Sequence, residues 1–351
     1  MRSRPRCCCN GYCIVQNDRR LKRLVACSAV ICAACGSGSG APVRVTIPPK
    51  ANLRVASDSL AKAGVIHFPR LFRLYASFRK SDRGIKAGTY SLRRNAGWGA
   101  VLDDLHGGKG LVHVVTVPEG WSLSQIAAAV SAKLSQPADS VEAASRDTAL
   151  LHRLDVPTPT LEGYLFPDTY VFPEGTSART AVDAMVKRFE QVWKPQWTAR
   201  LDTIHLSRND VMALAAIVEK EARLREERPV IAAVYLNRLR QGMLLQADPT
   251  VQYALGKHVS RVYYKDLDVE SPYNTYKHKG LPPGPIASPG RPSIEAALYP
   301  ANVPYVYFVA FPDGHHEFRA DLAAHEKAKV LARRAWDSVD VARRADSSRA
   351  K

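Results

Sequence analysis

The sequence has no cysteine after position 35. All seven cysteines lie within the first 35 of its 351 residues. The rest of the chain therefore forms no disulfide bond and no thiolate metal site. A body without cysteine avoids mispairing in an oxidising compartment, although a cytosolic chain can also lack cysteine.

Two catalytic motifs and a convincing metal site are absent as well. No glycine-rich phosphate loop occurs, and no Ser-His-Asp arrangement can be read from residue order. The histidines 315, 316 and 325 lie near acidic residues, but adjacent histidines on a strand point to opposite faces and cannot easily share one metal. The sequence therefore predicts no metal site.

The chain is basic, with a formal net charge of +17. Neutralising phosphates with such charge is the sequence-independent part of nucleic-acid binding. However, seven basic residues crowd the first 23 positions and many others follow Arg333, so the surplus is mainly terminal. We therefore expect no nucleic-acid partner, since an anionic polymer or membrane surface suits this charge equally well.

Residues 1–42 have the order of a membrane-targeting segment. Basic residues 19–23 precede the apolar run Leu24–Cys35 and the linker Gly36–Gly40. The apolar run is shorter than the roughly 20 residues that span a bilayer. A cleaved signal, a short signal anchor, a lipid-modified Cys35 and an unstructured basic tail all stay open.

Residues 43–155 show small strand–helix units. The pattern Val45-Thr-Ile-Pro48 opens a strand that is followed by a helix over 53–63, and Val115-Thr-Val-Pro118 opens a second such unit. Between them, residues 86–92 alternate as a strand does. The spacing predicts a weak internal repeat.

The sequence of residues 156–335 predicts a domain of mixed helices and strands, with a helical hairpin and a β-hairpin. Ser207 begins a capping box before Val211–Val218, which is apolar on nearly every side and should be buried. A second helix follows over 229–242, and residues 305–318 form two strands around a Pro-Asp-Gly turn. Because the expected helices and strands do not alternate regularly along the chain, the sequence predicts an α+β fold.

Two carboxyl groups end the apolar helix. Each residue turns a helix by about 100°, so Glu219 and Glu221 face different sides. Glu221 continues the apolar stripe Val211, Leu214 and Val218. Desolvation there favours the protonated form, which a general acid needs near neutral pH. Spacing alone also allows both glutamates merely to solvate a helix end.

Polar residues that could contact a sugar come later in the chain. Gln246 and Asp248 follow the second helix, which turns back toward the end of the first. Tyr273, Asn274 and Thr275 offer aromatic, amide and hydroxyl groups before a loop rich in proline and glycine. A helix cap at Asp248 and loop packing by the others are equally open.

Five long motifs occur in a fixed order: Leu161-Glu-Gly-Tyr-Leu-Phe-Pro-Asp-Thr-Tyr170, Ile217-Val-Glu-Lys-Glu221, Leu236-Asn-Arg-Leu-Arg-Gln-Gly-Met243, Leu245-Gln-Ala-Asp-Pro-Thr-Val251, and Tyr273-Asn-Thr-Tyr276 with Gly280-Leu-Pro-Pro-Gly284. At these motifs, and from about Val43 to Leu331, the chain resembles the endolytic murein transglycosylase (YceG-like) family. The resemblance implies that Glu221 is catalytic, acting as general acid and base without a metal or organic cofactor. Residues expected to bind substrate are Glu162, Gln246, Asp248, Tyr273, Asn274 and Thr275.

The resemblance also implies a domain plan and a location. The plan is a targeting segment (1–42), a LysM-like peptidoglycan-binding region (43–155), a catalytic transglycosylase domain (156–335) and a charged tail (336–351). The catalytic body is expected in the periplasm, associated with the inner membrane, with peptidoglycan strands and cell-wall synthases as partners. The expected reaction cuts MurNAc–GlcNAc bonds to give 1,6-anhydroMurNAc ends, which would terminate growing strands.

Two other functions compete with this interpretation. A hydrolase of the lysozyme kind would need a second carboxylate, for which Glu162 and Asp248 are candidates. A catalytically inactive scaffold in a cell-wall synthesis complex would bind glycan and cut nothing. The anchoring mode, the true start codon, the preferred strand length, the protein partners and the oligomeric state cannot be read from the sequence.

Overall fold

The computed structural model describes residues 40–81, 83–256 and 262–349. The predicted targeting segment lies outside these residues, apart from its last three positions. The chain divides into two compact units between Val112 and His113. Within the described ranges, no helix is both long enough and apolar enough to cross a membrane.

The first unit packs helices against an antiparallel strand pair. The strands β1 (Pro42–Ile47) and β2 (Gly88–Arg93) pair with Val45 opposite Tyr90. Asn52 accepts a hydrogen bond from the backbone N–H of Val55 and so caps the first helix. The helices are α2 (Leu53–Lys62), α3 (Pro69–Phe78) and α4 (Trp98–Gly107). This unit has its own core, which includes Ile47, Leu60, Phe72, Tyr90 and Leu102.

A four-stranded sheet has the order β1-β2-β3-β4. Strand β3 (Leu111–Thr116) pairs with β2 through its first two residues, Leu111 and Val112. The rest of β3 belongs to the second unit, where the Thr116 hydroxyl lies 3.1 Å from that of Thr169 in β4 (Thr169–Pro173).

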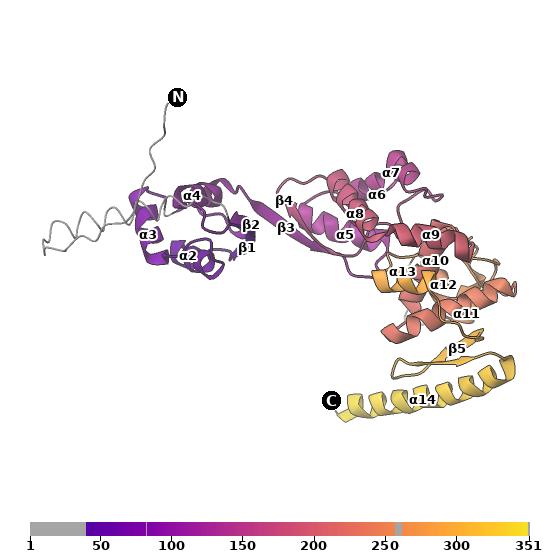
Figure 1. Cartoon of the computed structure of the whole chain (residues 1–351). Coiled ribbons are helices and arrows are strands. Elements are labelled where there is room, and N and C mark those ends of the chain that lie inside the picture. The colour runs from indigo at the N-terminus through magenta and orange to yellow at the C-terminus, as the bar shows by residue number, and fades with distance from the viewer. Residues whose placement is uncertain (1–39, 82, 257–261, 350–351) are drawn as a thin grey trace, which may run out of the picture. The chain divides into compact units, whose positions relative to one another are not determined.

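The second unit is mainly helical (Figure 1). Serine side chains cap several of its helices, with Ser122, Ser177 and Ser207 each accepting a backbone N–H three residues later. The α-helices are α5 (Leu123–Leu134), α6 (Ala138–Ser145), α7 (Thr148–Arg153), α8 (Ala178–Val192), α9 (Pro195–Ile204), α10 (Arg208–Glu221), α11 (Arg228–Arg240), α12 (Asp248–Ala254), α13 (Arg291–Leu298) and α14 (Leu322–Arg349). Two short 3₁₀ helices are η1 (Arg225–Glu227) and η2 (Tyr264–Asp268), and the hairpin strands are β5 (Tyr307–Ala310) and β6 (His316–Arg319).

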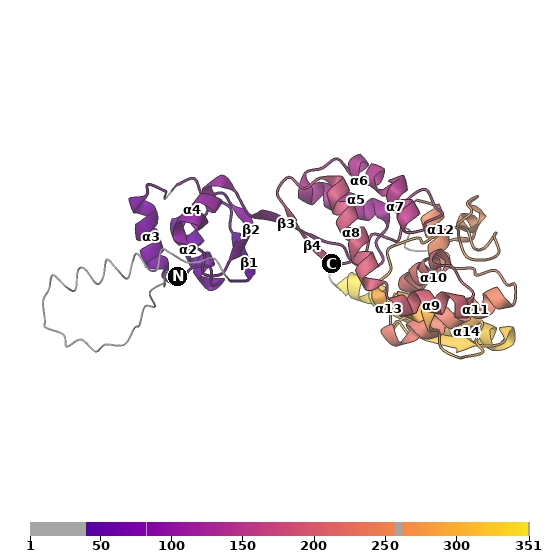
Figure 2. The same ribbon diagram turned by 45° about the horizontal axis from the view of Figure 1, so that its top comes forward.

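Helix α10 is the centre of the second unit. Every residue from Val211 to Val218 is buried, as the apolar sequence predicts. It contacts α11, α12 and α13, and α10 lies beside α11 and α13 in both ribbon views (Figure 2). Burial on all sides fixes α10 rigidly, so the two glutamates at its end point in defined directions.

The expected elements and the observed ones agree in type. The α+β fold class, the helical hairpin of α10 and α11, and the β-hairpin of β5 and β6 are confirmed. The helices α3, α6, α7, α9 and α13 were not anticipated. In the second unit, residues 113–155 share one hydrophobic core with the helices that follow them. The compact units therefore divide at 112/113, whereas the expected functional boundary at 155/156 stays a prediction.

Candidate active site

The carboxyl group of Glu221 lies where α10 ends. Ala222 adopts an extended conformation (φ −72°, ψ 117°), so the chain leaves the helix directly after Glu221. Oε1 of Glu221 accepts a hydrogen bond of 3.0 Å from the hydroxyl of Tyr235 on α11. Tyr235 is buried, and burial raises its pKa well above the usual value. Its hydroxyl therefore stays protonated and acts as a fixed donor.

Burial raises the pKa of Glu221 to about 7. The nearby negative charge of Asp248 raises it further, whereas the Tyr235 hydroxyl and the Arg238 guanidinium lower it. The residue keeps some exposed surface, so its carboxyl group is desolvated without being sealed off. A carboxyl group that titrates near neutral pH can both donate and accept a proton at that pH.

Asp248 and Arg238, whose charges act on Glu221, are held in place by hydrogen bonds. The hydroxyl of Tyr276 donates a 2.5 Å hydrogen bond to Oδ1 of Asp248, which lies at the start of α12. Arg238 on α11 donates to the carbonyl oxygens of Val306 and Leu245, both at 2.6 Å. Arg238 therefore ties the strand region and the α11–α12 loop to the helix while its charge acts on Glu221.

Glu219 has a different environment, although it is only two residues away. Its Oε1 accepts a 3.1 Å hydrogen bond from Nη2 of Arg228, and its Oε2 accepts from the backbone N–H of Gly290 and from the Ser293 hydroxyl. These three donors occupy the carboxylate. Glu219 thus joins α10 to the start of α13 and to α11.

Glu162 is a second carboxyl group with a raised pKa. The residue is buried, and burial raises its pKa to about 7 although three hydrogen bonds oppose this shift. The backbone N–H of Leu123 donates to Oε1 at 2.9 Å, and the hydroxyl of Tyr253 lies 3.5 Å from Oε2. The Tyr253 ring in turn lies 4.8 Å from the ring of Tyr273, centroid to centroid. The structure thus brings Glu162 and Tyr273 together through Tyr253.

The residue after Glu162 must be glycine. Gly163 has φ +81°, and a Cβ atom there would lie 2.3 Å from the side chain of Pro285. The loop that carries Pro285 therefore packs directly on the backbone next to Glu162. This close approach helps explain why so much proline and glycine lies between residues 280 and 290.

The other predicted contact residues lie partly inside the protein. Asn274 donates to the carbonyl oxygens of residues 267 and 269, and the Thr275 hydroxyl lies 2.9 Å from that of Thr250. Both are fully buried, so their polar groups hold the 273–276 loop in place. Gln246 and Asp248 are exposed beside this loop. Whether any of them contacts a substrate stays a prediction.

Sequence reasoning missed three residues that the structure places around the two carboxyl groups. Tyr235 donates a hydrogen bond to Glu221, and the charge of Arg238 lowers the pKa of Glu221. The hydroxyl of Tyr253 lies beside the carboxyl group of Glu162. The available signal was a tyrosine within the otherwise apolar run Ile231–Leu236 of α11. Nothing in residue spacing related it to Glu221, which is 14 positions earlier.

The three histidines have separate partners. His315 pairs with Asp313, the buried His316 pairs with Glu227 at 2.6 Å, and His325 stacks on Tyr307. Over the ranges that the structure describes, no group of three or more potential ligands of the His, Cys, Asp or Glu type is arranged to hold a metal.

The chain is similar to several known proteins. The model of the YceG-like family matches residues 45–330. The endolytic murein transglycosylase of Bacillus subtilis is 37% identical over 306 residues, which cover 82% of this chain and 84% of that one. The enzyme of the same name from Streptococcus pneumoniae serotype 2 is 31% identical, over 82% of this chain and 59% of its own length. A crystal structure of a yceG-like protein from Listeria monocytogenes has 34% identity and a TM-score of 0.57, and the match covers 83% of this chain and all of that one.

Proposed function

This chain belongs to the YceG-like family, and from that premise we propose that it is an endolytic murein transglycosylase in which Glu221 is the general acid and base. The observation that carries the assignment of Glu221 is its environment. Its carboxyl group has a pKa of about 7, one fixed donor and some exposed surface. Glu219 has its oxygens occupied by three donors within the protein.

The proposed reaction uses one carboxyl group twice. Protonated Glu221 gives its proton to the oxygen that links MurNAc to GlcNAc, and the bond from that oxygen to C1 of MurNAc breaks. The Glu221 carboxylate then takes the proton of the C6 hydroxyl of the same MurNAc, while O6 bonds to C1. Glu221 ends protonated, and the strand ends in a 1,6-anhydro sugar without consuming water.

The neighbours of Glu221 fit these two steps. The first step needs a carboxyl group that is still protonated near neutral pH, and burial together with Asp248 favours that form. The second step needs a carboxylate that is stable for long enough to accept a proton. The hydroxyl of Tyr235 and the charge of Arg238 favour that form. These opposing influences support a Glu221 pKa near neutral pH. At that pH the protonated form needed for the first step and the ionised form needed for the second are both accessible.

Mass spectrometry of the products tests the reaction. Uncrosslinked glycan strands are incubated with the purified chain, and the new ends are identified. We expect 1,6-anhydroMurNAc ends, which are lighter than reducing ends by one water molecule. Reducing ends would instead indicate a hydrolase that uses a second carboxylate such as Glu162 or Asp248. Strand binding without any new ends would indicate a scaffold.

We propose further that residues 43–155 position the strand for the cut. Residues 43–112 belong to the first unit, which has its own core, so they can be removed without opening the core of the second unit. Residues 113–155 share the core of the second unit. A chain that begins at His113 should fold, yet cut long strands more slowly than the whole chain. Equal rates from the two proteins would contradict a positioning role for residues 43–112.

The proposed location is the periplasmic side of the inner membrane. It rests on the basic cluster, apolar run and Gly-Ser linker before residue 42. A reporter enzyme fused after Ala41 should be active only outside the cytoplasm. Activity of this fusion in the cytoplasm would contradict the proposed location.

A further inference from the structure

A cavity of about 580 Å³ lies in the second unit, away from the Glu221 carboxyl group. Neither Glu221 nor Tyr235, Asp248 or Tyr276 lines it. Its walls come from α9, from the segment that contains η1 and the start of α11, and from α13. Its volume is in the usual range for small-ligand sites, about 300–1,000 Å³. We call it the cationic cavity, lined by Lys194, Trp197, Arg225, Arg228, Glu295 and Tyr299 among others.

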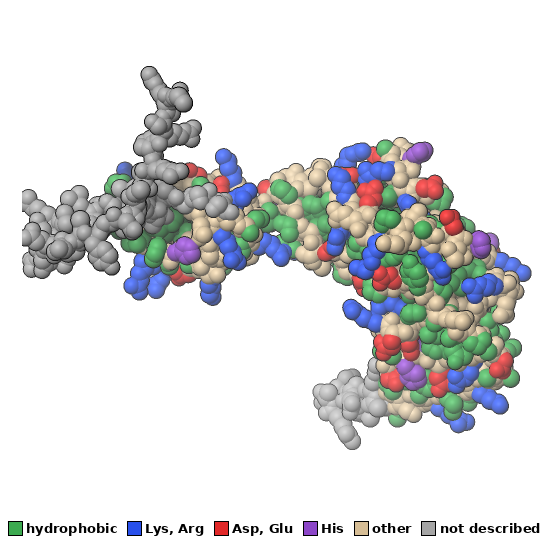
Figure 3. All heavy atoms as spheres, in the orientation of Figure 1, with side chains coloured by type: hydrophobic (Ala, Val, Ile, Leu, Met, Phe, Trp, Pro, Cys, Tyr) green, Lys and Arg blue, Asp and Glu red, His purple; other side chains and the backbone are tan. Residues whose placement is uncertain are grey.

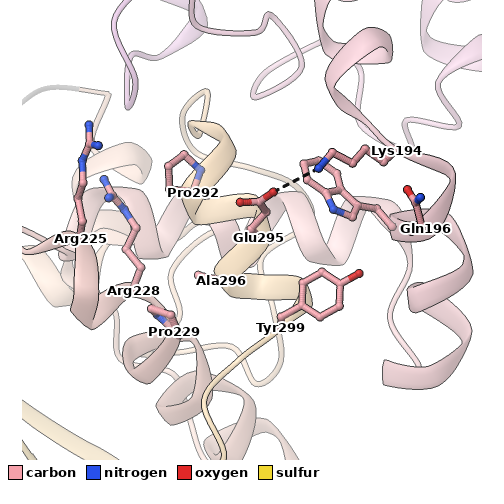
Figure 4. Close-up of a pocket in the computed structure, with 10 residues that line it drawn as sticks. Lys194, Gln196, Arg225, Arg228, Pro229, Pro292, Glu295, Ala296 and Tyr299 are labelled. Carbon is pink, nitrogen blue, oxygen red and sulfur yellow. Dashed lines mark ion pairs between the residues drawn. The ribbon is translucent and has the colours of Figure 1, made fainter.

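Positive charge predominates on the cavity wall. Figure 4 shows Arg225 and Arg228 on one side and Lys194 on the other, with Glu295 between them. Glu295 is the acidic residue among those lining the cavity. Its Oε1 lies 3.8 Å from Nζ of Lys194, which also lines the cavity, but only 2.9 Å from Nε of Arg291, which does not.

The two arginines retain hydrogen-bonding capacity. Arg228 is buried and bonds to Glu219 through Nη2, but its Nε and Nη1 have no partner among the described residues. Arg225 is exposed, and it takes part in none of the ion pairs found among the described residues. Glu119 lies within electrostatic range of both arginines and offsets part of their charge. An anion in the cavity could therefore pair with the exposed guanidinium of Arg225, while the buried charge of Arg228 adds to the positive potential behind it.

The cavity also has apolar surface for a ligand that is more than a simple ion. Trp197 and Tyr299 contribute aromatic rings, and Pro229 and Pro292 contribute aliphatic ones. Nζ of Lys194 lies 5.5 Å from the Trp197 ring centroid, so a cation and a flat apolar face are adjacent. This lining suits a short peptide with carboxylates, small apolar side chains and an amino group that donates a hydrogen bond to Glu295.

We propose that the cationic cavity binds the carboxylate-bearing peptide branch of a murein strand. The assignment of the ligand rests on the proposed function, because peptides attached to the sugars are what distinguishes murein from a plain glycan. Arg228 links the cavity wall to the end of α10 that carries Glu221. Arg228 bonds to Glu219, which precedes Glu221 by two residues on α10. A bound peptide branch would therefore help to fix which sugar faces the carboxyl group.

Binding of a free peptide tests the site separately from cleavage. The probe is the soluble tetrapeptide branch with free carboxylates, titrated into the full chain by calorimetry, beside the same peptide with its carboxylates amidated and inorganic phosphate. We expect the free-carboxylate peptide to bind, and Arg225→Glu to weaken it about tenfold or more, as expected for loss of a charged hydrogen bond. The matched control is Arg333→Glu, an exposed arginine on α14 that does not line the cavity.

The outcomes separate this inference from the proposed function. Loss of peptide binding in Arg225→Glu with normal binding in Arg333→Glu supports the site, even if no strand is ever cut. No binding to the unaltered chain, equal binding by both variants, or equal binding of the amidated peptide would overturn it. Equal or tighter binding of phosphate would show a general anion site and overturn the assignment to a peptide. If strands are cut, Arg225→Glu should raise KM for peptide-bearing strands and leave KM for peptide-free strands unchanged.

Discussion

The two sides of the α10 end differ more than their sequence suggests. On one side Glu219 is held by Arg228, Gly290 and Ser293, all within the protein. On the other side, within the part of the chain that the structure describes, Glu221 accepts one hydrogen bond, and burial raises its pKa to about 7. Two glutamates separated by one lysine thus receive opposite environments. A carboxylate whose oxygens all accept hydrogen bonds from protein groups serves to join helices. A carboxylate with an oxygen that accepts no such bond can exchange a proton with a substrate.

The difference arises from helix geometry and from the neighbouring elements. Two positions along a helix correspond to a rotation of about 200°, so the side chains point to nearly opposite sides. The side of Glu219 meets the start of α13, where backbone and hydroxyl donors converge. The side of Glu221 meets Tyr235 and the region of Asp248. Each of the following variants changes one side and leaves the other in place.

The largest expected effect is the loss of cleavage in Glu221→Gln. The amide keeps the shape of the side chain but has no transferable proton. General acid–base catalysis contributes about a hundred- to ten-thousand-fold in rate, and one group serves both proposed steps, so the loss should reach the upper end. The assay follows 1,6-anhydro products from uncrosslinked strands, with thermal melting as the folding control. Near-normal product from a folded variant would refute the assignment of Glu221.

Glu219→Ala should instead lower stability. It leaves the buried Arg228 without its carboxylate, and removing one partner of a buried ion pair costs about 3–5 kcal/mol. The free energy of unfolding is measured by denaturant titration, with Lys220→Ala as the control for an exposed neighbour on the same helix end. A stable Glu219→Ala protein that cuts no strands would transfer the catalytic role to Glu219. Glu219→Gln, which keeps the shape, should retain most of the activity.

Tyr235→Phe should shift the pH dependence of cleavage upward. The Tyr235 hydroxyl stabilises ionised Glu221, and so lowers its pKa. A hydrogen bond to a charged group contributes about 1.5–3 kcal/mol, which corresponds to about one to two pH units. If protonated Glu221 starts the reaction, kcat/KM falls as the pH rises through this pKa, and the fall should move to higher pH in the variant. An unchanged or lower midpoint would contradict the stabilisation of ionised Glu221 by the Tyr235 hydroxyl.

Sequence patterns predict the central helix α10 and both hairpins and favour Glu221 as the candidate acid, but they predict neither the helices α3, α6, α7, α9 and α13 nor the surroundings of Glu221. Periodicity and capping residues predict α10 and its burial, because both depend on neighbours within a few positions. The apolar stripe selects Glu221 for the same reason. By contrast, the contact with Tyr235 depends on how α10 and α11 cross, and the bonds of Glu219 depend on α13, some 70 residues later.

The predicted contact residues show the same limit. The side chains of Tyr273, Asn274 and Thr275 suit sugars, yet Asn274 and Thr275 form their hydrogen bonds inside the protein. Polar groups in a loop are equally suited to holding that loop together, and the sequence does not distinguish the two uses. Glu162 is similar, since only the structure shows the Leu123 N–H and Tyr253 beside it.

The smallest expected effect is that of Asp248→Asn, and its direction is opposite to that of Tyr235→Phe. The charge of Asp248 raises the pKa of Glu221. Removing that charge should therefore lower this pKa and move the fall in kcat/KM to lower pH. Asparagine still offers an oxygen to the Tyr276 hydroxyl, so the loop should keep its position. Because Asp248 is exposed, solvent and salt screen its charge, and the shift should stay below about one pH unit and shrink as salt is added. The double variant Tyr235→Phe with Asp248→Asn should then titrate between the two single variants. A shift of Asp248→Asn to higher pH would show that this residue affects Glu221 through position and not through charge.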